Sequence, residues 1–391
     1  MQYLQTEASA DQNIRALEVP QILSEELTEW DYETYRRITT VELNEIQEER
    51  IRIPKNTFPR QDTVVAMHWH PEFIPMEMIR ERVCTMFPNK SQELIIPTNH
   101  NILNSYDGKY TGVEVDCFAR PFNRKVQILL HFENSRLEKA DVLKSMLKHT
   151  LKYRSSQLFE LIHSIVDPNL DHRLQAAGKM YGADDDLLRF VKVYTRKLER
   201  LLVEHESETP QDHIKNKLLA NYFDQLREIY DDRLIKRAQF LIQKVKKIVK
   251  KHFSPDYFYA IEEFIEETRM LGGGIVIPHP EQFWPILLAE YDVDGIEAWN
   301  PQSQEYTEFL INVVNLKNKT QLSGQRPILI FMGDDCHLSE KIKEPQNQNK
   351  EKVKREVGFQ PAWDDLAIRK SLIVANMDRQ KLIEEYLARL G

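Results

Sequence analysis

Short apolar runs rich in valine and isoleucine recur along the chain, and several of them end in histidine or a carboxylate. Runs of this length without polar alternation are typical of strands buried on both faces of a sheet, as parallel strands are. Helical candidates lie between the runs, for example Met76–Phe87 and Glu281–Glu290. The alternation of strand and helix predicts an α/β barrel. The predicted strands are residues 63–67, 93–97, 110–118, 125–132, 274–278, 295–299 and 327–332.

One long segment, residues 137–271, interrupts this alternation. It is highly charged and carries apolar residues at helical spacing, such as Leu187, Leu188 and Val191. We interpret it as an all-helical insertion between two barrel strands. The polar stretch Lys341–Lys354 is expected to be a mobile loop before a helical tail. The predicted organisation is an N-terminal helical extension (1–60), a first barrel part (61–136), the insertion (137–271), a second barrel part (272–338), and a polar loop with helical tail (339–391).

The composition is that of a globular protein without a general affinity for polyanions. The net charge of −8 gives no overall attraction to nucleic acid or to anionic membranes, although the basic run 243–251 leaves a local nucleic-acid contact open. No apolar run approaches the roughly 20 residues of a membrane helix, so we expect no membrane partner. Three cysteines cannot form a disulfide framework, and a reducing cytoplasm is the expected location. The composition indicates no particular oligomeric state.

Histidines are concentrated at the ends of the predicted strands. His68 and His70 close the first apolar run, and side chains two residues apart point to the same face of a strand. Two such imidazoles can bind one metal ion. Barrel enzymes place their chemistry at the C-terminal ends of strands, and a mixture of imidazole and carboxylate suits Mn, Zn or Fe. The further candidate metal ligands in such positions are His100, Glu114, His279, Asp335 and His337.

The order of these motifs resembles the polymerase and histidinol phosphatase (PHP) family of metal-dependent phosphoesterases. The resemblance covers residues 64–131 and 272–337. It implies a distorted seven-stranded (β/α) barrel of PHP type, here with the large all-helical insertion. The matching motifs are His68-Trp69-His70, Thr98-Asn99-His100-Asn101, Gly112-Val113-Glu114, Pro278-His279-Pro280, Gly295-Ile296-Glu297 and Gly333-Asp334-Asp335-Cys336-His337.

The resemblance implies a site for two or three divalent ions, Mn, Zn or Fe. A first ion would take His68, His70, Glu114 and Asp335. Glu114 would bridge to a second ion bound by His279, and a third ion would take His100 and His337. The resemblance also implies Asp335, His337 and His279 as catalytic residues, with metal-activated hydroxide attacking phosphorus.

Three positions depart from the family pattern. Pro75 stands where many members carry a ligand of the third ion, so Glu72 or Glu77 would have to substitute. Gln127 stands where many members carry a histidine. His131, four residues on, faces the same side of a regular strand and is the candidate replacement, although it lies about 13 Å further along. Asn99 replaces an aspartate that usually orients a ligand.

These observations favour a cytoplasmic metal-dependent phosphoesterase that hydrolyses a small phosphomonoester or nucleotide. Arg120, Arg124 and Arg369 are candidate phosphate-binding cations. One alternative is a nuclease or nucleic-acid-linked phosphoesterase that uses the basic run 243–251. Another is a catalytically degenerate metal-binding domain that acts through a protein partner. Hydrolysis of a C–N bond is disfavoured because the expected lysine is missing.

Overall fold

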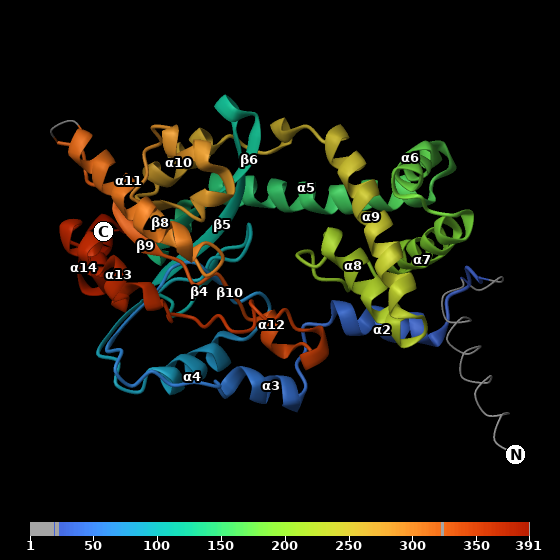
Figure 1. The fold of residues 1–391 in the computed structure, drawn as a ribbon, viewed down its shortest axis with the longest axis horizontal. Helices are drawn as coiled ribbons and strands as arrows, with labels where there is room; N and C mark the ends of the chain where they lie inside the picture. Colours follow the sequence, from blue (N-terminus) through green and yellow to red (C-terminus); the bar gives the residue numbers. More distant parts are fainter. Residues whose placement is uncertain (1–18, 20–22, 322–323, 391) are drawn as a thin grey trace, which may run out of the picture. The chain divides into compact units, whose positions relative to one another are not determined.

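The chain forms two compact units. The computed structural model describes residue 19, residues 23–321 and residues 324–390. Of these described residues, the smaller, helical unit comprises those up to residue 40 and 151–257, and the larger, sheet-containing unit comprises 41–150 and those from residue 258 onward. The segment 137–271, expected to be one helical insertion, is therefore divided between the two units. Figure 1 shows the ribbon with its elements labelled.

The larger unit contains every predicted strand. Each of the seven predicted runs includes one, and the α/β class is thereby confirmed. Three short strands were not predicted; each contains only two residues. The strands are β1 (Thr63–Ala66), β2 (Trp69–His70), β3 (Gln92–Ile95), β4 (Asn104–Ser105), β5 (Tyr110–Ala119), β6 (Arg124–Glu133), β7 (Gly274–Ile277), β8 (Gly295–Trp299), β9 (Leu329–Met332) and β10 (Cys336–His337).

The described strands do not close into the predicted seven-stranded barrel. They form one six-stranded sheet in the order β4-β5-β6-β7-β8-β9 and two separate pairs, β1-β3 and β2-β10. The expectation of parallel strands was wrong for the β5–β6 and β6–β7 pairs, which are antiparallel, whereas β7, β8 and β9 pair parallel. Only the short turn at 120–123 joins β5 to β6, whereas a parallel pair needs a crossover of a dozen or more residues. The long β5–β6 hairpin therefore replaces a β/α unit (Figure 1).

Helices surround the sheets of the larger unit. The predicted helix Glu281–Glu290 is instead an irregular 3₁₀ segment, η6 (Pro280–Leu288), because Pro285 interrupts it and Phe283 has non-helical dihedral angles. The predicted C-terminal helix is broken into two. The α-helices are α3 (Glu45–Arg52), α4 (Met76–Met86), the start of α5 (Asp141–Val166), α10 (Ile261–Met270), α11 (Thr307–Thr320), α12 (Ser339–Ile342), α13 (Leu366–Val374) and α14 (Arg379–Leu390).

The polar stretch that follows α12 is anchored to the rest of the unit. Lys341 is buried, and its ammonium group donates to the carbonyls of Val353 and Arg355. The same ammonium lies 3.0 Å from Glu356, which also forms a bidentate pair with buried Arg82. The network fixes the backbone around Arg355, and the side chain of Arg355 in turn bonds to Asp335. The expectation of a mobile loop over 341–354 did not anticipate this anchoring.

The smaller unit is a helical bundle with its own apolar core. Val245 and Val249 of the basic run are buried, while Lys247, Lys250 and Lys251 are exposed, as on a solvated amphipathic helix. Among the described residues, no helix combines the length and apolar character required to cross a membrane. The helices are α2 (Glu29–Thr39), the remainder of α5, α6 (Asp171–Tyr181), α7 (Asp185–Glu204), α8 (Asn216–Gln225) and α9 (Asp232–His252).

Candidate metal centre

Four of the predicted ligands converge on one point inside the larger unit. His68 follows β1, His70 lies in β2, Glu114 lies in β5, and Asp335 lies between β9 and β10. The Nε2 atom of His68 is 3.9 Å from Glu114 Oε1 and 3.8 Å from Asp335 Oδ1. The Nε2 atom of His70 is 3.7 Å from Glu114 Oε2 and 3.5 Å from Asp335 Oδ1. Ligand atoms bound at about 2.1 Å to one ion lie at roughly such separations from one another.

Two ligand atoms of this cluster lack hydrogen-bond partners in the protein. His68 Nε2 and His70 Nε2 are buried and unsatisfied, whereas the buried Glu114 Oε2 has His100 Nδ1 2.6 Å away. An unpaired buried polar atom is costly, and native proteins keep such atoms where a ligand or ion completes them. Imidazole nitrogen and carboxylate oxygen are donors suited to Zn, Mn or Fe. The residues therefore fit a divalent metal ion.

A second group of ligands adjoins the first through His70. His70, His100 and His337 each offer a ring nitrogen, and these nitrogens lie within 4.8 Å of one another. The His70 ring stacks with each of the other two, with centroids 4.6 Å from His100 and 4.2 Å from His337, and the His100 and His337 centroids are 6.0 Å apart. Glu72 Oε1 lies 3.4 Å from His337 Nδ1. Of the two carboxylates expected to replace the ligand missing at Pro75, Glu72 is thus beside the cluster, whereas Glu77 is exposed on α4.

Glu114 lies between several imidazoles. His100 Nδ1 is 2.6 Å from its Oε2 atom, and His279 Nε2 is 3.2 Å from its Oε1 atom. Each oxygen of this carboxylate therefore lies beside a different histidine. The pKa of Glu114 is held well below its ordinary value, because the surrounding histidines outweigh the effect of burial, which raises it.

Burial and charge shift the pKa values of the two opening histidines in opposite directions. Burial lowers the pKa of His68, but Glu297, Asp335 and Glu114 outweigh it and raise the pKa to about 10. Burial, His337 and His100 lower the pKa of His70 to about 3. The His70 ring is therefore neutral and can bind a metal ion directly. A metal ion must displace a proton from the His68 ring, so the affinity for metal is expected to increase with pH.

Several residues at or next to ligand positions adopt backbone conformations that non-glycine residues rarely occupy. Glu72, Asn101, His279 and Asp335 all have positive φ angles. Such strain is characteristic of functional sites, where the surrounding structure imposes it. The Asn99 side chain accepts from the Glu72 backbone N–H and donates to the Glu72 carbonyl. An aspartate could not donate the second bond, so asparagine suits this strained turn.

Glu297 orients two ligand positions, a role that the sequence reasoning missed. Its Oε2 atom is 2.5 Å from His68 Nδ1, and its Oε1 atom accepts from the His279 backbone N–H. Hydrogen bonding at Nδ1 leaves His68 Nε2 as the metal donor. A Cβ at Gly333 would collide with the Glu297 carboxylate, so this approach requires glycine. The Gly295-Ile296-Glu297 motif was the sequence feature that could have indicated this role of Glu297.

Glutamine in place of Glu297 is expected to weaken metal binding by about 10- to 100-fold, because the amide is a weaker partner for the His68 imidazole. Metal affinity measured by competition with a chromogenic chelator, at several pH values, would detect the change. Glu305, which is exposed on the following turn, provides the matched control. Equal affinity in Glu297→Gln and Glu305→Gln would contradict the orienting role.

Asp335 is held by two further side chains that the sequence did not indicate. Its Oδ2 atom accepts from Arg355 Nη1 at 2.6 Å and from Gln302 Nε2 at 2.6 Å. Arg355 Nη1 also donates to the Asp335 carbonyl. These bonds leave Oδ1 directed at the nitrogens of His68, His70 and His337. Arginine and glutamine thereby set which oxygen of Asp335 is available to an ion.

His131 shares a hairpin face with Glu114 but is engaged elsewhere. Its Nε2 atom lies 3.0 Å from the Met67 carbonyl, and its Nδ1 atom lies 2.7 Å from the Tyr386 hydroxyl. Burial lowers the pKa of His131 to about 3, so the ring is neutral. Both ring nitrogens are used by the protein, and the structure does not bring His131 to the cluster as a replacement for Gln127.

The same face of the hairpin continues past Glu114 with polar residues. Antiparallel pairing places Asp116 opposite Gln127, and both follow Glu114 on one face. Gln127 Nε2 lies 3.4 Å from His100 Nδ1. Lys125 Nζ lies 2.6 Å from Asp116 Oδ1 and is partly exposed. Lys125, which the sequence did not indicate, therefore lies two residues before Gln127, whose amide contacts His100 of the cluster.

The three arginines suggested by the sequence are occupied or exposed. Arg120 pairs with Glu263 at 3.5 Å, and the guanidinium of Arg124 lies over the Phe283 ring. Arg369 is exposed on α13. No contact links any of these three to the cluster in the part of the chain that the structure describes.

The chain is similar in structure to a solved protein. No family model matches the chain, and no curated protein matches it. A solved structure from Bifidobacterium adolescentis, provisionally described as a metal-dependent phosphoesterase, matches 81% of this chain and 97% of its own. The two share 14% sequence identity, with a TM-score of 0.41.

Proposed function

We propose that the protein is a metal-dependent phosphoesterase of the PHP type that hydrolyses a small phosphomonoester or nucleotide. The observation that carries the proposal is the buried group of ligand atoms on His68, His70 and Glu114, in which the Nε2 atoms of both histidines have no hydrogen-bond partner in the protein. A site whose ligands are oriented by Glu297, Arg355 and Gln302 is built for an ion rather than for packing. The free cysteines, two of them buried, are compatible with a reducing cytoplasm.

The site would hold its ions on His68, His70, Glu114 and Asp335, with His279, His100 and His337 as further ligands. Divalent ions there would supply Lewis-acid stabilisation of the phosphoryl oxygens and a lowered pKa for water. Glu297 and Arg355 keep the ligands in one orientation before substrate arrives, which avoids reorganisation during the reaction.

Lys125 is our candidate for binding the anionic substrate. Its ammonium is held by buried Asp116, whose other oxygen accepts from Asn101 beside His100 in the sequence. The cation is on the hairpin face that leads away from the ligands, where a second charged group of a substrate could reach it. An ammonium binds phosphate as a point charge without demanding a fixed orientation.

Purified full-length protein, stripped with chelator and reloaded separately with Mn, Zn or Fe, tests the proposal. We expect at least one reloaded form to release inorganic phosphate from a panel of phosphomonoesters and nucleotides, and chelator to abolish the release. Lys125→Met should raise KM more than it lowers kcat, because the cation acts in binding. Stoichiometric metal binding without hydrolysis of any substrate would favour the degenerate alternative.

A further inference from the structure

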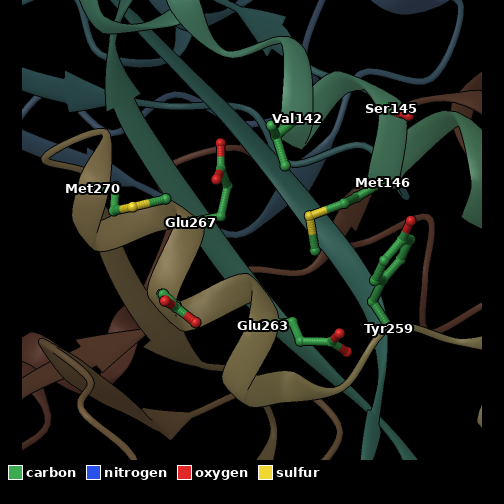
Figure 2. Close-up of a pocket in the computed structure, with 8 residues that line it drawn as sticks. Val142, Ser145, Met146, Tyr259, Glu263, Glu267 and Met270 are labelled. Carbon is green, nitrogen blue, oxygen red and sulfur yellow. The ribbon is translucent and has the colours of Figure 1, made fainter.

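A cavity of about 360 Å³ that is open to solvent lies in the larger unit between the start of α5 and helix α10, away from the ligands of the candidate metal centre (Figure 2). One wall is formed by residues at helical spacing on α5, and the other by residues at helical spacing on α10. Tyr259 closes one end, and its ring is packed edge-on against His149. The lining residues are Val142, Ser145, Met146, Tyr259, Glu263, Glu266, Glu267 and Met270.

Glu267 is the unusual residue of this cavity. Only 7% of its surface is exposed, and its side chain has no hydrogen-bond or ion-pair partner among the residues that the structure describes, although its carboxylate oxygens are not fully closed off from solvent. Figure 2 shows its carboxyl group entering the space between Met270 and Val142. Glutamate is rarely buried this deeply unless it is paired. The missing partner is therefore expected to come from outside the chain.

The other lining residues restrict what that partner can be. The lining contains three glutamates and no lysine or arginine. The glutamates are not among the carboxylate groups whose oxygens converge within 4.8 Å, as a bound metal ion would require. Val142, Met146 and Met270 supply apolar walls beside Glu267. The Glu267 carboxylate beside these apolar side chains suits a ligand in which an ammonium group is attached to a chain of methylene groups.

A second ammonium would find further acceptors on α10. Glu263 lies four residues before Glu267, about 6 Å along the helix, and the exposed Glu266 directly precedes Glu267. Glu263 already accepts from the Ala260 backbone N–H and pairs with Arg120, so Glu266 is the less committed of the two. A short linear chain with an ammonium at each end offers one charge to Glu267 and the other to one of these two carboxylates.

We propose that this cavity binds a short aliphatic diamine, with one ammonium on Glu267 and the methylene chain against Met146 and Met270. The site is separate from the proposed metal centre and does not depend on the proposed hydrolysis. An ion pair formed on binding would give the Glu267 carboxylate the partner that it lacks in the protein.

Isothermal titration of the full chain with 1,4-diaminobutane, in the presence of excess chelator, tests the proposal. We expect saturable binding at one site, at least 10-fold weaker binding in Glu267→Gln, and less than a 2-fold change in Glu262→Gln. Glu262 is on the same helix but does not line the cavity. Equal affinity in wild type and Glu267→Gln, or equal binding of uncharged 1,4-butanediol, would overturn the proposal.

A tethered ammonium provides a second, independent test. Met270 is 73% exposed and lies three residues after Glu267, so lysine can be accommodated there. We expect Met270→Lys to abolish diaminobutane binding and to raise the temperature of unfolding, whereas Met270→Gln should do neither. Undiminished diamine binding in Met270→Lys would contradict the assignment of Glu267 as the acceptor.

Discussion

Alanine in place of Asp335 is expected to abolish metal binding at the first ion position and to lower hydrolysis by more than about 100-fold. Removing a residue that merely orients a ligand already costs about 10- to 100-fold, and Asp335 is itself a candidate ligand. Its Oδ1 atom faces the nitrogens of three histidines. Metal content by elemental mass spectrometry and phosphate release after reloading would measure both effects.

The control for this experiment must separate lost coordination from lost structure. Arg355 is buried and bonded to Asp335, so alanine leaves a charge without its partner. Asp335→Asn retains an oxygen for Arg355 but is a poorer ligand, and we expect it to lose metal while keeping the circular dichroism spectrum of the wild type. Normal turnover in either variant would exclude Asp335 from the metal centre.

Methionine in place of Lys197 is expected to destabilise the helical unit by about 3–5 kcal/mol. Lys197 Nζ lies 2.8 Å from Asp31, and both side chains are buried. Without the ammonium, the Asp31 carboxylate keeps its bonds from Tyr222 and Thr28 but not its counter-ion. Urea unfolding followed by circular dichroism would measure the loss.

An exposed pair offers the matched control. Lys192 pairs with Asp171 in the same unit, but about a third of each side chain is exposed, so Lys192→Met should cost about 1 kcal/mol or less. A loss below 1 kcal/mol in Lys197→Met would show that the buried pair contributes nothing unusual.

The same buried pair has a defined pH dependence. Burial raises the pKa of Asp31, but bonds from Lys197, Tyr222 and Thr28 outweigh it, so the pKa is lowered in the folded protein. A lowered carboxyl pKa stabilises the fold above the unfolded value, and this stabilisation is lost as the pH falls below about 4. The wild type should therefore lose more stability on acidification than Lys197→Met does.

Local patterns predicted the strands well. The runs containing β1, β5 and β9 are buried along most or all of their length, and burial of consecutive valine, isoleucine and leucine residues is a property of the local sequence. Pairing was harder to predict. The short turn at 120–123 was the signal for an antiparallel hairpin, and reading the runs as uniform parallel strands overlooked it.

The candidate site shows the same division. His68 and His70 could be placed together because alternation along an extended chain is local. His131 obeyed the same alternation, yet its two nitrogens bond to Met67 and Tyr386. The two-residue alternation of a strand predicts on which face of the sheet a side chain lies, but it does not predict which atoms of other elements contact that side chain.

The sequence by itself therefore determined the α/β class, the positions of the strands and the candidate ligands at their ends, because burial and alternation depend on neighbouring residues. Only the tertiary structure decided that Glu297 meets His68 across 229 residues, that Arg355 and Gln302 select one oxygen of Asp335, and that Glu267 is left unpaired in a cavity. These contacts join residues far apart in the chain, and their geometry depends on how separate elements pack, which no local pattern contains.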